Sequence, residues 1–207
     1  MNGANEKEEK LTLDLLNAID QQSDLSQRNL AQHMGIALGL TNSYLKRCAR
    51  KGLVKVSEAP ANRYLYYLTP KGFAEKARLT GRYLADSLTF YSQASESCSA
   101  IIELCKKNNV ERIMICGVSE LSEIALIRAT DADIRITGIY DPESSLDQLF
   151  SIPVWADLAL VGDFDVCLLT DLKSPYEFYK SLVREVGKDS ILIPDVLGIT
   201  EKSERVK

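Results

Sequence analysis

Residues 25–56, LSQRNLAQHMGIALGLTNSYLKRCARKGLVKV, decide the fold of the first part of the chain. Ser26 stands before an apolar periodic run, and serine is a preferred N-cap residue. Gly35 interrupts the run, and a second run with helical spacing ends just before Gly52, a residue type that commonly follows a helix C-terminus. The stretch therefore predicts two short helices joined by a tight turn, the second covering about residues 38–51.

The flanking segments add a helix on one side and a hairpin on the other. Residues 10–21 carry apolar side chains at three- and four-residue spacing, which predicts a preceding helix. Residues 53–56 and 64–68 are apolar runs on either side of a polar bend, which predicts a two-stranded hairpin. Thr69 and Pro70 are typical of a helix start. The order helix, helix, turn, helix, strand, bend, strand, helix is that of a winged helix-turn-helix.

Charge is divided unevenly along the chain. Residues 25–82 hold eleven Lys or Arg residues and two acidic residues, a net charge of +9, although the whole chain carries −4. Residues 83–207 hold twelve basic and twenty-one acidic residues, and residues 1–24 hold two basic and six acidic. A basic block in an acidic protein is typical of a module that binds a polyanion. On a winged helix, this block predicts binding to double-stranded DNA.

The predicted helix at residues 38–51 has an apolar and a polar side. Four apolar side chains are expected to pack inward, namely Leu40, Tyr44, Leu45 and Cys48. Three polar residues lie in the opening turns, where a recognition helix meets base edges in the major groove: Thr41, Asn42 and Ser43. Asn42 suits an adenine edge, and Thr41 suits a hydrogen bond or a thymine methyl. Phosphate contacts are expected from Lys46, Arg47 and Arg50, and contacts with a neighbouring minor groove or its phosphates from Lys55 and Arg63.

The same stretch, continued by RYLYYLTPKGFAEKARLT at residues 63–80, resembles MarR-type winged-helix regulators. Within that family it is most similar to the group associated with exopolysaccharide synthesis. The likeness covers residues 25–80, about a quarter of the chain. The resemblance implies a dimeric bacterial transcription factor whose third helix reads DNA. A homodimer would match a palindromic operator.

Residues 70–107 predict one long helix, or two helices joined near residues 95–97, because no proline follows Pro70 and apolar residues recur in a broken helical pattern. A long helix after the wing favours packing against a second copy of the chain. Packing between the domains of one chain is the alternative. The predicted domains are residues 1–80 for the winged helix, 81–108 for the connecting helix and 109–200 for the remainder.

The last hundred residues alternate between strand-like runs and amphipathic helices. Strands are expected at residues 111–116, 134–140, 153–155, 165–170 and 190–194, and helices at 121–129 and 175–186. This alternation predicts a Rossmann-like parallel sheet with helices, so the chain as a whole is expected to be α/β. The runs RIMICGVSELSEIAL, ITGIYDP, SIPVWADL and FDVCLLTD resemble the nucleotide-binding domain of redox-sensing repressors and related CoA-binding domains. They are also similar to the N-terminal domains of sugar acyltransferases.

A parallel sheet binds ligands beyond the carboxyl ends of its strands. The candidate cofactor-binding residues there are Gly117, Val118, Ser119 and Asp141. Asp141 lies 24 residues after Gly117, close to the spacing of the ribose-binding acid in dinucleotide folds. The loop departs from the phosphate-binding pattern G-x-G-x-x-G, because Ser119 and Ser122 stand at the second and third glycine positions. Glu120 adds negative charge where a pyrophosphate would lie.

The sequence leaves three roles open for this second domain. It could bind a phosphate-bearing ligand, namely NAD(H), CoA or a nucleotide sugar. It could bind another small metabolite, and in both cases the chain is expected to be a regulator that senses an effector. In the third role the domain is a degenerate Rossmann-like unit that serves dimerisation or protein recruitment, and the chain is a DNA-tethered adaptor.

The sequence indicates neither an enzyme nor a metal site. His33 is the only histidine and lies in the basic part of the chain, so no histidine is available to the second domain for catalysis. Five cysteines without a CxxC pair predict neither a zinc site nor a disulfide framework, which fits a reducing cytoplasm. No apolar run approaches 18 residues and the N-terminus is polar, so no membrane association is expected.

Overall fold

A computed structural model of the chain describes residues 3–22, 25–59 and 63–199. The chain divides into two compact units, residues 1–88 and 89–207. The division falls inside one helix, α4 (Pro70–Lys107), which contributes residues to both units. The domain limits drawn from the sequence stay a prediction.

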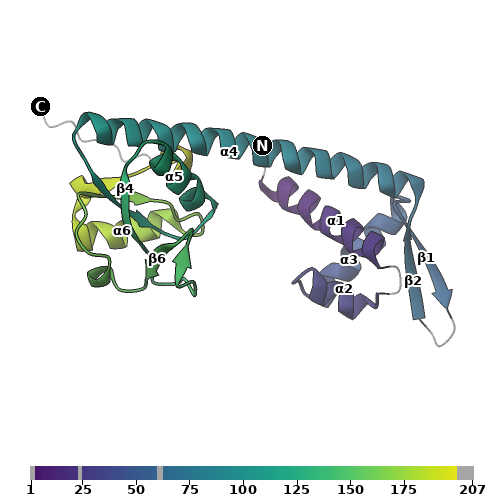
Figure 1. Cartoon of the computed structure of the whole chain (residues 1–207). Coiled ribbons are helices and arrows are strands. Elements are labelled where there is room, and N and C mark those ends of the chain that lie inside the picture. The colour runs from purple at the N-terminus through teal and green to yellow at the C-terminus, as the bar shows by residue number, and fades with distance from the viewer. Residues whose placement is uncertain (1–2, 23–24, 60–62, 200–207) are drawn as a thin grey trace, which may run out of the picture. The chain divides into compact units, whose positions relative to one another are not determined.

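The described part of the first unit contains helices, one hairpin and the beginning of α4 (Figure 1). Its elements are α1 (Gly3–Gln21), α2 (Gln27–His33), α3 (Leu38–Arg50), β1 (Val54–Ala59) and β2 (Arg63–Leu68). The element order of a winged helix-turn-helix is therefore confirmed. One detail differs from the expectation, because α1 begins well before residue 10. Of the two alternatives for residues 70–107, the structure has the single continuous helix, α4.

Local contacts explain where the helices begin. Ser26 caps α2, because its Oγ accepts a hydrogen bond from Asn29 N at 3.1 Å. Thr69 caps α4: its Oγ1 accepts from Gly72 N at 3.0 Å and donates to Gly52 O at 2.6 Å. A Cβ at position 72 would lie 2.0 Å from Leu53 O, so only glycine allows α4 to pack this closely against the start of the hairpin.

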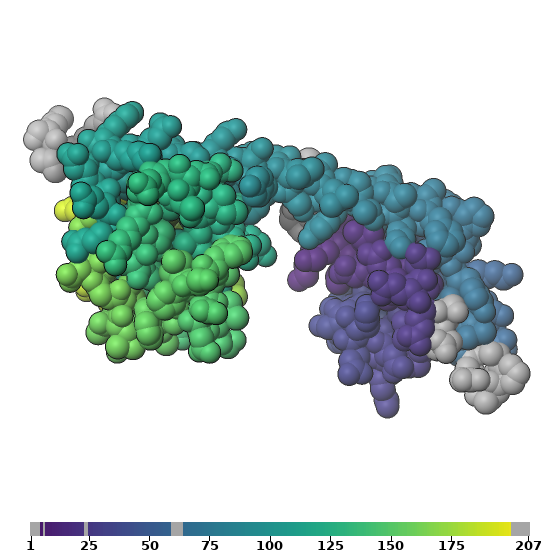
Figure 2. All heavy atoms as spheres, in the orientation of Figure 1, coloured from purple at the N-terminus to yellow at the C-terminus, as the bar shows by residue number. Residues whose placement is uncertain are grey.

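The core of the first unit joins all of its helices to the wing. Its largest buried side chains include Leu15, Leu16, Leu30, Leu45 and Tyr66. The hairpin is antiparallel, with Val54 opposite Leu68 and Val56 opposite Tyr66. Figure 2 shows the surface of α1, in purple, between that of α2 and α3 and that of the beginning of α4. α1 is therefore placed to contact both α3 and α4.

The second unit is built on a six-stranded sheet. Its elements are β3 (Arg112–Cys116), α5 (Glu120–Asp131), β4 (Arg135–Tyr140), β5 (Gln148–Leu149), β6 (Ile152–Trp155), β7 (Val166–Leu169), α6 (Pro175–Val186) and β8 (Ile191–Leu192), with short 3-10 turns at Leu158–Leu160, Lys188–Ser190 and Asp195–Leu197. The strand order is β5-β6-β4-β3-β7-β8. Without β5, the strands follow the order third, second, first, fourth, fifth, which doubly wound α/β sheets share.

The sheet is mixed, although a purely parallel sheet was expected. β5 runs antiparallel to β6 because the chain reverses at Phe150 and Ser151, which both adopt positive φ angles. The crossover from β4 to β6 contains this hairpin in place of an α-helix. The α/β class and the long helix before the sheet are confirmed, and a Rossmann-like role for the sheet stays a prediction.

Helices cover both faces of the sheet. On one face, α5 and the end of α4 pack against strand residues, with Cys98, Ile102, Leu121, Ile115 and Ile139 at the centre. On the other face, α6 packs against Met114, Cys116 and Leu169 through Tyr179 and Leu182. Cys116 and Cys167 are buried, and burial raises the pKa of the Cys116 thiol well above its usual value. The carboxyl ends of β3, β4 and β7 are left at one edge, beside the starts of α5 and α6.

Candidate nucleic-acid interface and the crevice of the second unit

The buried side of α3 differs from the expected one by one residue at its start. Thr41 is fully buried and its hydroxyl donates to Ala37 O at 3.2 Å, whereas Leu40 is 43% exposed. Leu45 and Cys48 are buried as expected. The prediction that Thr41 contacts a base is therefore wrong, because its side chain completes the core between α3 and its neighbours.

The outward side of α3 is formed by Ser43, Lys46 and Arg50, which are all exposed. Side chains at positions i, i+3 and i+7 lie on one face of a helix, so these three lie together. Two are cations and one carries a hydroxyl. The face therefore offers donors suited to phosphate oxygens and to base edges.

Asn42 turns toward the wing instead of outward. It lines a groove of about 320 Å³ between α3 and the hairpin, whose lining residues are Gln27, Asn42, Leu45, Lys46, Ala49, Val56, Tyr64 and Tyr66. Asn42 Oδ1 is buried there and has no hydrogen-bond partner within the described residues. Gln27 Nε2 donates to Tyr66 OH at 3.2 Å on the same side. Gln27 and Tyr64 were not among the candidate residues predicted from the sequence, because their contact with this groove depends on how α2 and the hairpin pack beside α3.

Lys55 and Arg63 were expected to contact a neighbouring minor groove or its phosphates. Lys55 is exposed and lies opposite Tyr67, while Val56 and Tyr66 line the groove. Because side chains alternate along a strand, Lys55 projects from the hairpin face that is turned away from the groove. Arg63 begins β2, and its side chain lies outside the described residues. Contacts of both residues with DNA stay predictions.

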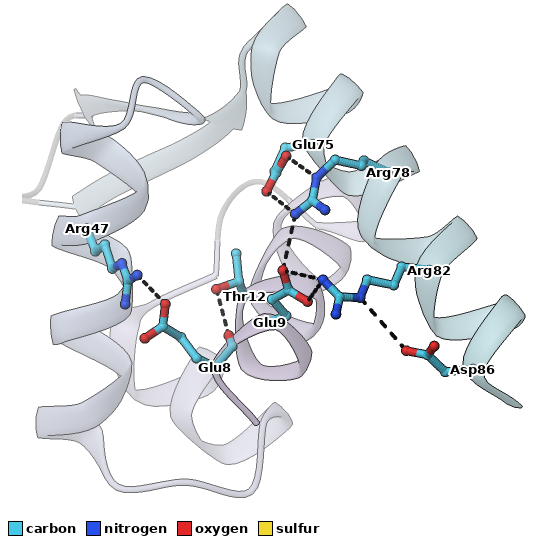
Figure 3. A network of polar contacts seen from close by, with 8 residues as sticks. All are labelled: Glu8, Glu9, Thr12, Arg47, Glu75, Arg78, Arg82 and Asp86. Atoms are coloured by element: carbon cyan, nitrogen blue, oxygen red, sulfur yellow. Dashed lines mark hydrogen bonds and ion pairs between the residues drawn. The ribbon is translucent and has the colours of Figure 1, made fainter. Parts of the chain in front are cut away.

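Arg47 is paired with an acid inside the unit. Its guanidinium donates to the Glu8 carboxylate of α1, and this contact lowers the pKa of Glu8 (Figure 3). Glu9, the next residue of α1, forms ion pairs with Arg82 at 2.9 Å and Arg78 at 3.5 Å on α4. Lys76 of α4 pairs with Asp20 of α1 at 2.6 Å. Acids of α1 therefore neutralise several charges of the basic block.

The predicted crevice residues of the second unit do come together. Gly117 follows β3 with φ +103°, and a Cβ there would lie 2.7 Å from the backbone nitrogen of Asp171. The Asp141 carboxylate follows β4 and is 8% exposed. It accepts hydrogen bonds from Val118 N at 2.8 Å and from Glu143 N at 2.9 Å. A carboxylate of the chain itself thus occupies the amide of Val118.

At the start of α5, backbone amides likewise donate hydrogen bonds to side chains of the chain itself. Ser119 Oγ accepts from Leu121 N at 3.1 Å and from Ser122 N at 3.4 Å, while Ser122 Oγ accepts from Ser119 N at 3.0 Å. This reciprocal capping box satisfies amides that would otherwise be free to bind an anion. The residues predicted to bind a cofactor therefore form an internal hydrogen-bond set.

An open cavity lies beside this closed set. It has a volume of about 250 Å³ and is lined by Asp141, Pro142, Glu143, Asp171, Lys173, Ser174, Glu177, Phe178 and Ser181. Four lining residues are acids and one is a cation, which disfavours a phosphate-bearing ligand. Within the described residues, no group of three or more His, Cys, Asp or Glu side chains is arranged to hold a metal. No described helix is long and apolar enough to span a membrane.

Comparisons with known proteins found one matching family and several similar solved structures. Residues 8–55 match the family of winged helix-turn-helix DNA-binding domains. The PcaV transcriptional regulator from Streptomyces coelicolor shares 22% identity over 48% of this chain and 75% of its own, with a TM-score of 0.39. The S. aureus MepR-DNA complex shares 25% identity over 42% of this chain and 62% of its own, with a TM-score of 0.36. No curated protein matches the chain. The family match and the element order show that the first unit contains a winged helix-turn-helix DNA-binding domain.

Proposed function

We propose that the protein is a sequence-specific transcriptional regulator of the MarR type, which binds double-stranded DNA in the cytoplasm as a homodimer. The observation that carries this proposal is the outward face of α3, where Ser43, Lys46 and Arg50 are exposed on a winged helix-turn-helix domain. Lys46 and Arg50 would contact phosphates, and Ser43 would contact base edges. Asn42 would add sequence preference if an edge of a base reached the groove beside the wing.

The test is a titration of a labelled duplex between 50 and 200 mM salt. Each lost phosphate contact lowers the slope of log affinity against log salt by about 0.9. Lys46→Ala/Arg50→Ala should therefore flatten the slope by about 1.8 for each α3 that binds. The matched control is Lys106→Ala/Lys107→Ala, which removes the same charge from exposed residues at the end of α4. Equal slopes for the wild type and the α3 variant would remove the proposed function.

The proposed dimer is supported by exposed apolar side chains on the part of α4 that belongs to the first unit. Phe73, Leu84 and Leu88 are 51%, 54% and 67% exposed. Their spacing of eleven and four residues places them on one side of the helix. We propose that a second copy of the chain covers this side, which gives two α3 helices for a palindromic site. Leu84→Glu/Leu88→Glu should give a monomer in light scattering, and a dimer that survives both changes would exclude this interface.

For the second unit, we propose that a small metabolite binds in the 250 Å³ cavity beside Asp141. The cavity supports this proposal because Phe178 and Pro142 offer apolar surface and the surrounding acids offer acceptors. The effector would then alter DNA binding, and such coupling is typically about 1–3 kcal/mol. NAD(H), CoA and nucleotide sugars are the phosphate-bearing candidates, and the closed start of α5 counts against them.

A second candidate role, protein recruitment, is favoured by two exposed apolar side chains in the segment after β4. Leu146 is 48% and Phe150 is 62% exposed. A thermal-shift panel with nucleotides, CoA, nucleotide sugars and small amines or sugars separates the two roles. A ligand at 100 times its dissociation constant raises the free energy of unfolding by about 2.7 kcal/mol. Stabilisation by one class of compound, lost in Phe178→Ala, would support the sensor. Silence across the panel would favour the adaptor.

A further inference from the structure

The ion pair between Glu8 and Arg47 links α1 to the recognition helix. Glu8 lies in the first half of α1, and Arg47 lies in the last turn of α3. Both side chains are 37% exposed, so solvent and ions reach the pair. Figure 3 shows the Arg47 side chain extending from α3 toward α1 and the Glu8 carboxylate. The contact therefore draws this guanidinium to the flank of α3.

Arg47 differs from the other cations of α3 in having a carboxylate partner. Among the ion pairs of the described residues, Lys46 and Arg50 have no carboxylate partner, whereas Arg47 has Glu8. Arg47 follows Ser43 by four residues and precedes Arg50 by three, so it borders the outward face that these residues form. A rotation about its side-chain bonds would bring the guanidinium to that face. From its backbone position, Arg47 can place its guanidinium either at the flank of α3 or at the outward face. The ion pair with Glu8 holds it at the flank.

We propose that Glu8 is a positioning residue that holds Arg47 off the DNA-facing side of α3. The inference rests on the proposed binding of DNA through α3. In this arrangement the domain engages DNA with one phosphate contact fewer per α3 than its sequence provides. The α1 carboxylate and a DNA phosphate compete for the same guanidinium, and an exposed ion pair is weak enough for that competition to matter. Glu8 thereby lowers the affinity for every DNA sequence while leaving base recognition to other residues.

The test is the salt dependence of DNA binding by Glu8→Gln. This substitution keeps the shape of the side chain and removes its charge. If Arg47 is released to a phosphate, the slope of log affinity against log salt steepens by about 0.9 per α3. Between 50 and 200 mM salt, that slope adds about a threefold loss of affinity for each α3. At 50 mM salt Glu8→Gln should bind more tightly than the wild type.

The matched control is Glu9→Gln, which removes the same charge from the adjacent residue of α1 but breaks ion pairs with Arg78 and Arg82 of α4 instead of the pair with Arg47. The slope for Glu9→Gln should stay close to that of the wild type, because Arg78 and Arg82 lie on α4 and keep Glu75 and Asp86 as partners. The double variant Glu8→Gln/Arg47→Ala should return the slope to the wild-type value, because Arg47 adds no phosphate contact in either protein. Circular dichroism melts of each variant separate these effects from unfolding.

The outcomes distinguish this inference from the proposed function. A wild type that binds DNA through Lys46 and Arg50, together with equal slopes for Glu8→Gln and Glu9→Gln, would overturn the role of Glu8 and leave the proposed function intact. Weaker binding by Glu8→Gln would also overturn it, since Glu8 would then help Arg47 to bind. A wild type without affinity for DNA would remove the proposed function itself.

Discussion

The starts of α3 and α5 differ in how their first backbone amides find hydrogen-bond acceptors. The first amides of any helix have no partner within the helix. At α5, Ser119, Ser122 and Asp141 supply acceptors from the chain itself. At α3, the N-cap residue Ala37 provides no side-chain hydrogen bond, and the opening residues are exposed. One helix start is thus completed internally, and the other is left for water or an external partner.

The difference shows that small polar residues near a helix start do not identify a binding site by themselves. Their acceptors and donors serve a ligand only when nothing in the fold reaches them first. In the second unit, the turn after β4 brings Asp141 back to the loop after β3. In the first unit, no acid follows the turn before α3 until Glu58. Substitutions that remove individual hydrogen-bond partners test whether the start of α5 is closed and the start of α3 is open.

Asp141→Ala should have the largest effect on stability. The carboxylate is buried and accepts two backbone hydrogen bonds, and bonds to a charged group are worth about 1.5–3 kcal/mol each. Water from the adjacent cavity offsets part of the loss. We expect the free energy of unfolding of the second unit to fall by about 3 kcal/mol, measured by denaturant unfolding monitored through Trp155.

The same variant should open the start of α5 to anions. Inorganic phosphate at ten times its dissociation constant would restore about 1.4 kcal/mol to the Asp141→Ala protein and nothing to the wild type. The control is Glu143→Ala, which removes an exposed carboxylate from the same cavity but leaves the Val118 amide occupied. Equal stabilisation of the wild type by phosphate would show that its crevice is already open.

Ser119→Ala should cost less, about 1 kcal/mol of unfolding free energy, which is typical of a lost N-cap. The substitution removes the acceptor for the Leu121 and Ser122 amides but leaves Ser122 Oγ in contact with the backbone of residue 119. Asp141 would still hold the Val118 amide. A loss as large as that of Asp141→Ala would mean that the capping box, and not the carboxylate, keeps the crevice closed.

Much of the fold could be predicted from the sequence, because it depends on local patterns. Ser26, Gly35 and Gly52 mark the ends of α2 and α3, and strand-like runs mark β3, β4 and β7. The reversal at Phe150 and Ser151 was missed, since neither residue is a usual turn former at positive φ. The long continuous α4 was one of two stated alternatives.

The candidate sites were less predictable because they depend on contacts between distant segments. Thr41 appears polar in a helical pattern, yet its hydroxyl bonds to Ala37 O within the same turn and the side chain fits the core. Arg47 appears free until α1 folds across it and supplies Glu8. The charge count gave a hint, since residues 1–24 are acidic beside a basic block, but it does not pair one charge with another. Spacing locates a residue on an element, and only packing decides its partner.

Asn42→Ala should have the smallest effect on stability. It tests whether the polar residues at the start of α3 are left without partners inside the fold. Its Oδ1 is buried without a partner among the described residues, so its removal breaks no hydrogen bond at that atom. We expect a change in the free energy of unfolding within about 0.5 kcal/mol. Gln27→Ala, in the same groove, should lose about 1 kcal/mol because it breaks the bond to Tyr66 OH. If Asn42→Ala were the more destabilising of the two, Asn42 would be a structural residue like Ser119, and the groove between α3 and the wing would be closed rather than kept for DNA.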